Sequence, residues 1–153
     1  MKKLTIIGVL VVSALGTLFH FIYQWIPIFI FPSSESIFEH MKLIVFPFLF
    51  YFVGCLFFYK GDKANLFSSF ITAILTSILC VIVFYYTYSG FIGKNIDVVN
   101  IIIYYVSVIL GFIWIYKKKT LVSFSNSIIF LLILFILITV FSFYPPDLSF
   151  FKG

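Results

Sequence analysis

The sequence predicts an all-α integral membrane protein, with a single transmembrane domain over residues 1–153 that crosses the bilayer as a bundle of five helices. Hydrophobic residues make up 63% of the chain and its mean hydropathy is +1.23. Soluble domains contain about 45–50% apolar residues, and the core of so short a chain cannot bury the excess. The apolar residues also form five long runs, so lipid is the expected solvent for most of the surface.

The five runs have the length of membrane-spanning helices. They cover residues 4–23, 37–59, 66–88, 98–116 and 121–144. A helix needs about 20 residues to cross the hydrocarbon core. Barrel strands would be about half as long and would alternate in polarity. Because lipid offers backbone groups no partners, we expect five helices.

The first run could be mistaken for a signal peptide, because Lys2 and Lys3 precede it. Its apolar stretch is longer than the roughly 7–15 residues of a signal peptide, and no Ala-x-Ala cleavage pattern follows it. We therefore expect a retained first span.

The lysines predict the orientation. Seven of them fall on one side of the predicted spans: Lys2, Lys3, Lys60, Lys63, Lys117, Lys118 and Lys119. The positive-inside rule assigns that side to the cytoplasm, which predicts a multi-pass protein of the cytoplasmic membrane, N-in and C-out. The net charge of +5 lies in short loops between spans, so it does not indicate nucleic-acid binding. The Lys- and Phe-rich composition without Arg indicates an AT-rich bacterial source.

Aromatic residues, cysteines and a proline add detail. Tyr or Trp residues at span ends are typical of interfacial belts; they are Tyr23, Trp25, Tyr59, Tyr88, Tyr116 and Tyr144. Cys55 and Cys80 form no C-x-x-C motif and are expected to stay unpaired. Pro47 frees the carbonyl of Leu43, so a kink is expected in the second span.

The third span carries a stripe of small residues, Ser69, Ala73 and Ser77. Small residues four apart let helix backbones approach closely in lipid. The stripe predicts a packing face, and it is where we would expect a homo-oligomer or a membrane partner to bind. A polar pore lining is the alternative.

Ionisable side chains gather at the predicted outer ends of the spans, where they mark a candidate site because such groups are costly in lipid. The candidate site residues are His20, Glu35, Ser36, Glu39, His40, Lys42, Asp97 and Asn100. Ser36 and Glu39 fit a helix capping box. Lys42 lies three residues after Glu39 and can pair with it.

The two histidines, His20 and His40, are expected at similar depth on adjacent spans, and three interpretations are open. They can be hydrogen-bonded core residues. They can be ligands of a divalent metal such as zinc, with Glu39 or Glu35 completing the set. They can also be axial ligands of a haem between the first two spans, which is the least expected case.

Two stretches resemble an uncharacterised family of small bacterial multi-span membrane proteins. They are residues 20–25 (HFIYQW) and residues 35–43 (ESIFEHMKL), which contain a Glu-Ser-x-x-Glu-His-x-Lys motif. Gln24 stands where that family usually has an acid, and Ser34 where it usually has Asn. The resemblance implies a multi-span membrane fold and points to the same polar residues. It implies no activity.

Three functional hypotheses follow. In the first, an outward-facing polar site at the ends of spans one, two and four binds, senses or passes a small solute or cation. In the second, a membrane-embedded hydrolase holds a metal with His20, His40 and Glu39, Glu35 acts as general base, and Lys42 stabilises an oxyanion. No H-E-x-x-H motif supports it. In the third, the protein is an accessory or assembly subunit of a membrane complex.

Overall fold

The computed structural model describes residues 2–22 and 30–151, and this part of the chain is helical without strands. The helices are α1 (Lys2–Ile22), α2 (Ile37–His40), α3 (Lys42–Phe58), α4 (Lys63–Ile92), α5 (Asp97–Lys117), α6 (Phe124–Phe143) and the short η1 (Ser149–Phe151). Five segments are long and apolar enough to cross a membrane: α1, α2 with α3, α4, α5 and α6. The prediction of an all-α bundle is confirmed, with five helical segments long and apolar enough to cross a membrane.

The helix ends differ from the predicted spans because caps, not apolar residues, set them. Helix α4 was expected over residues 66–88 but runs from Lys63 to Ile92. Asp62 accepts hydrogen bonds from the amides of Ala64 and Asn65 at 2.9 and 3.1 Å, which starts the helix one turn earlier. Gly93 ends it in the left-handed conformation, at φ 76°.

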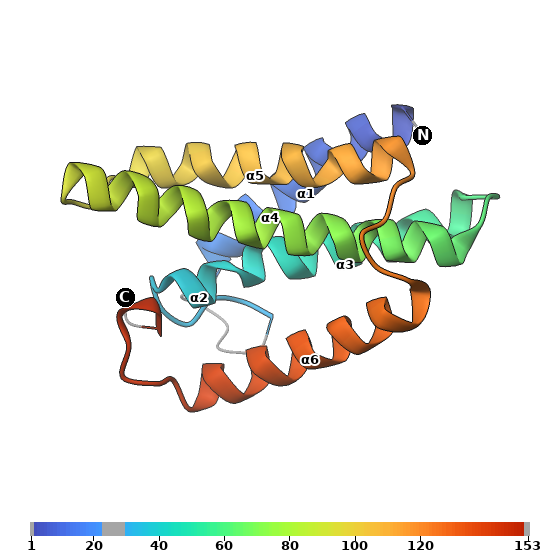
Figure 1. The fold of residues 1–153 in the computed structure, drawn as a ribbon. Coiled ribbons are helices and arrows are strands. Elements are labelled where there is room, and N and C mark those ends of the chain that lie inside the picture. Colours follow the sequence, from blue (N-terminus) through green and yellow to red (C-terminus); the bar gives the residue numbers. More distant parts are fainter. Residues whose placement is uncertain (1, 23–29, 152–153) are drawn as a thin grey trace.

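The bundle has two chemically different ends (Figure 1). We call the end where α1, α4 and α6 finish and α2 and α5 begin the polar end; it lies on the left of Figure 1, near the C-terminus. The opposite end, which holds the N-terminus and the α3–α4 and α5–α6 connections, is the lysine end. Helix α6 lies along one side of the bundle, packs on α4 and buries only Ser127 and Ile138.

Helices α1, α3 and α5 meet at Tyr104. Its hydroxyl shares its hydrogen between the carbonyl oxygens of Val12, at 3.1 Å, and Leu43, at 3.4 Å. The Leu43 carbonyl is the one that Pro47 leaves without a helical donor. Gly16 permits this approach, because a Cβ there would collide with the Tyr104 hydroxyl and lie 2.7 Å from the Leu43 oxygen.

Helix α3 runs through Pro47, and the kink expected there stays a prediction. The second span is interrupted at Met41, six residues earlier. The interruption is slight, because the Met41 amide still donates to the carbonyls of Ile37 and Phe38. It separates the short α2, which carries His40, from α3.

The stripe of small residues packs inside the chain. Ser69, Ala73 and Ser77 are buried, and the Ser77 hydroxyl donates to the Ser107 carbonyl of α5 at 2.9 Å. A Cβ at Gly111 of α5 would lie 2.8 Å from the Ala73 oxygen. The predicted packing role is therefore filled within the chain, where α5 packs against Ala73 and Ser77. The contact with a second copy or a membrane partner stays a prediction.

The cysteines and the aromatic residues at the span ends were also predicted from the sequence. Cys55 and Cys80 are unpaired, as predicted. Tyr59 and Tyr144 lie at the C-terminal ends of α3 and α6, and Tyr116 lies in the last turn of α5. Tyr23, Gln24 and Trp25, on which two sequence arguments depend, lie outside the described residues.

Candidate functional site at the polar end

Of the two hydrogen bonds of the predicted capping box at the start of α2, one is formed. The Ser36 hydroxyl accepts a hydrogen bond from the Glu39 amide at 3.2 Å, as a capping box requires. The Glu39 carboxylate does not return to the Ser36 amide, which instead donates to the Ser34 hydroxyl at 3.4 Å. Ser36 is therefore a cap, and Glu39 has other partners.

Glu39 and Lys42 form the expected ion pair, and it is buried. Lys42 Nζ lies 2.7 Å from Glu39 Oε2, and the two residues are 0% and 4% exposed. Ser33 adds two donors to the same oxygen, from its amide at 2.6 Å and its hydroxyl at 2.9 Å. Ser142 donates to Oε1 at 3.1 Å, and Lys42 also donates to the Phe31 carbonyl at 3.4 Å. The pair satisfies what a buried charge requires.

This ion pair joins segments that are far apart in the sequence. Glu39 belongs to α2, Lys42 to α3 and Ser142 to α6. Phe38 and Phe141 pack beside it at 5.8 Å between ring centroids, and Phe151 of η1 covers Phe38 at 4.8 Å. The pair therefore closes the polar end of the bundle and holds the end of α6 against α2.

A second group of ionisable side chains lies nearby and is more accessible. His20, in the last turn of α1, and His40, at the end of α2, have ring centroids 5.3 Å apart. Glu35 Oε2 lies 3.3 Å from His40 Nε2. One ligand atom from each of the three residues lies within 4.8 Å of the others. We call these three residues the histidine group.

The backbone fixes the proton on His40. Its Nδ1 lies 2.9 Å from the Ser36 carbonyl oxygen, which can only accept, so Nδ1 must carry the hydrogen. In the neutral ring Nε2 then presents its lone pair to the Glu35 carboxylate, and two acceptors face each other. A hydrogen shared by the two atoms, or a metal ion between them, turns this contact into a favourable one.

The histidine group has the chemistry of a site for zinc or a similar ion. Two imidazoles and a carboxylate suit this metal. At bond lengths of about 2.0–2.2 Å, ligand atoms around a tetrahedral ion are roughly 3.3–3.6 Å apart. The His40–Glu35 pair already has such a spacing, at 3.3 Å. The Glu35 side chain is 56% exposed, so it has room to move toward the two imidazoles.

The geometry differs from the metal set His20, His40 and Glu39 that the sequence indicated. Glu39 faces Lys42 and the serines, and Glu35 takes the third place beside the histidines. The reason is burial: only Lys42 can balance a carboxylate so deep in the bundle.

Asp97 and Asn100 lie apart from this arrangement. Asn100 bonds to the Tyr88 hydroxyl and donates to Asn95 Oδ1 at 2.8 Å. Tyr88 also donates to Asn95 Oδ1 at 2.8 Å. This network stabilises the α4–α5 connection, and Asp97 lies in the first turn of α5. Within the described residues, the expected contribution of the fourth span to the site is not seen.

The sequence analysis did not identify two residues, Ser33 and Ser142, that donate hydrogen bonds to Glu39. Ser33 precedes Glu39 by six residues and could have been suspected as a loop donor. Ser142 lies more than a hundred residues away, and nothing in its surroundings (residues 124–143 hold no ionisable side chain) indicates that it reaches Glu39.

Comparison with curated proteins and with solved structures finds no match for this chain. A family model does match, and it covers residues 1–153. As the resemblance in the sequence implied, the chain belongs to an uncharacterised family, described as "Family of unknown function (DUF6512)".

Proposed function

We propose that this protein binds a divalent transition-metal cation, of the zinc type, through His20, Glu35 and His40. The observation that carries the proposal is the contact between His40 Nε2 and Glu35 Oε2 at 3.3 Å, with Nδ1 of the same ring held by the Ser36 carbonyl. A backbone acceptor on the far nitrogen is the usual way in which proteins orient a metal-binding imidazole.

Accessibility supports binding rather than a purely structural role. The side chains of His40 and Glu35 are 30% and 56% exposed, so an ion can reach them from the aqueous boundary of the bundle. Three protein ligands also leave a coordination position for water or for another donor. The lysine distribution supports an outward-facing site in the cytoplasmic membrane, with the ion taken from outside the cell.

Binding or sensing is favoured over passage of the ion. The segment of α3 that follows Lys42 toward the bilayer centre, residues 43–48, is apolar and buried. A cation leaving the histidine group in that direction would meet no side-chain ligand among residues 43–48. Charged species are costly in such surroundings.

The hydrolase alternative receives no support from the geometry. Lys42 was its oxyanion donor, but it is fully buried and paired with Glu39. Glu35 was its general base, but it lies with the histidines as a ligand candidate. Among the described residues near the group, no other carboxylate is left to activate water.

The test is metal content in purified protein. Wild type, His20→Ala, His40→Ala, Glu35→Gln and the control Asp97→Asn are equilibrated with zinc or cobalt, dialysed and analysed for metal. We expect about one ion per chain in wild type and in Asp97→Asn, and little in the other three variants. Bound cobalt should show the intense visible absorption of a tetrahedral site in wild type and in Asp97→Asn, and not in the other three variants. Equal metal content in wild type and His40→Ala would refute the proposal.

A further inference from the structure

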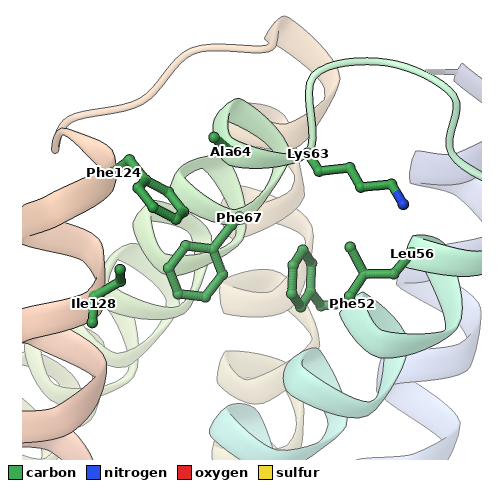
Figure 2. A pocket seen from close by; sticks show the side chains of 7 residues that line it. All are labelled: Phe52, Leu56, Lys63, Ala64, Phe67, Phe124 and Ile128. Atoms are coloured by element: carbon green, nitrogen blue, oxygen red, sulfur yellow. The ribbon is translucent and has the colours of Figure 1, made fainter.

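A groove at the lysine end of the bundle is unrelated to the histidine group. It has a volume of about 310 Å³ and lies between α3, α4 and α6 (Figure 2). Its walls are Phe52 and Leu56 of α3, Phe67 of α4, and Phe124 and Ile128 of α6. Lys63 lies at its mouth, with its side chain extended toward Leu56.

The walls of the groove are set by aromatic packing. Phe67 contacts Phe52 and Phe124, at 5.4 and 5.7 Å between ring centroids, and so links α3 to α6. Ala64, one turn before Phe67, also lines the groove, and its side chain is too small to fill the space next to Phe67. Phe124 and Ile128 are 47% and 41% exposed, so the groove opens on the surface that lipid covers.

The charge at the mouth is positive and is not neutralised by a neighbouring acid. Lys63 is the first residue of α4, and within the described residues it forms no ion pair. The acid in the same connection, Asp62, accepts hydrogen bonds from the amides of Ala64 and Asn65. Lys60 adds a second positive charge outside the groove.

We infer that the groove holds one acyl chain of an anionic phospholipid, with the phosphate bound by Lys63. Lys63 begins a membrane-spanning helix, so its ammonium reaches the level of the lipid headgroups. The volume equals about ten water-sized groups at ~30 Å³ each, which suits part of one chain and not a whole lipid. An apolar chain below and a cation above match a lipid with a net negative headgroup.

The experiment reads lipid contact from inside the groove. Ile128→Trp places an indole in the wall, and the parent protein supplies the signal of the two native Trp for subtraction. The protein is reconstituted in vesicles that contain either brominated phosphatidylglycerol or brominated phosphatidylcholine, and quenching of the introduced indole is measured. We expect about fivefold stronger binding of phosphatidylglycerol, the effect of one lysine on an anionic lipid.

Four further variants separate this site from general charge attraction. Lys63→Gln should reduce the preference to near one, whereas Lys63→Arg should keep it. Lys60→Gln is the matched control and should leave the preference intact. Ala64→Phe should weaken quenching by both lipids because it fills the groove. Equal quenching by the two lipids in the Ile128→Trp protein, or an equal loss in Lys60→Gln and Lys63→Gln, would overturn the inference.

Discussion

The polar end holds two ionisable groups that share the segment of residues 33–42 and differ in burial and in hydrogen bonding; His20 of α1 completes the second group. The Glu39–Lys42 pair is buried, and each of its charged groups has several hydrogen-bond partners. The histidine group is partly exposed. Its closest atoms, His40 Nε2 and Glu35 Oε2, are both acceptors when the imidazole is neutral. A charge whose partners are complete serves the fold, whereas ligand atoms that face one another near water are available for chemistry.

The largest expected effect is on the buried pair. Lys42→Met leaves the Glu39 carboxylate without its cation in a low-dielectric environment, and we expect a loss of about 3–5 kcal/mol of stability. The measurement is thermal or SDS-induced unfolding in detergent. Adding Glu39→Gln to Lys42→Met should recover part of the loss, because the unpaired charge is then removed. An unchanged midpoint in Lys42→Met would mean that the pair is solvated and incidental.

A smaller effect is expected where α6 joins this pair. Ser142→Ala removes the donor to Glu39 Oε1, and a hydrogen bond to a charged group contributes about 1.5 kcal/mol at the lower end of the usual range. Thr139→Ala is the matched control on α6, since within the described part of the chain its hydroxyl donates to the Phe135 carbonyl of its own helix and to no other residue. Unfolding midpoints that fall equally in the two variants would show that the Ser142 contact does not hold α6.

The smallest effect on stability is expected in the histidine group. Glu35→Gln removes one partner of a half-exposed ion pair, and without metal the unfolding free energy should change by less than about 0.5 kcal/mol. We expect zinc to raise the melting temperature of wild type, and Glu35→Gln should lose this rise. A metal-free loss as large as that of Lys42→Met would make Glu35 a structural residue and would remove the contrast between the two groups.

The membrane-spanning part of the fold was predictable because lipid imposes a simple rule. A run of about 20 apolar residues has to be a helix, whatever its neighbours are. The local pairings were predictable for a similar reason: Glu39 and Lys42 are three residues apart, and Ser36 stands at a helix start. Each of these inferences needs only residues within one or two helical turns.

The sequence could not predict which carboxylate lies beside the histidines and which pairs with Lys42. Sequence spacing allows either Glu35 or Glu39 to join the histidines, and it gives no depth for either carboxylate. Burial decides between them, and burial depends on Ser33, Phe31 and the distant Ser142. Asp97 and Asn100 were placed with the site because they begin a span at the same end, but lateral position in a bundle depends on helix packing.

The sequence by itself determined that this chain is a bundle of five helices apolar enough to span a membrane, and that both histidines and four of the five acidic residues fall at one end, because hydrophobicity and chain order are one-dimensional. Only the tertiary structure decided that α5 packs against the small-residue stripe at Ala73 and Ser77 and that Glu39 bonds to Lys42 and Ser142. It also decided that Glu35 lies beside the two histidines. Those outcomes depend on which helix faces meet, and packing between distant segments sets that.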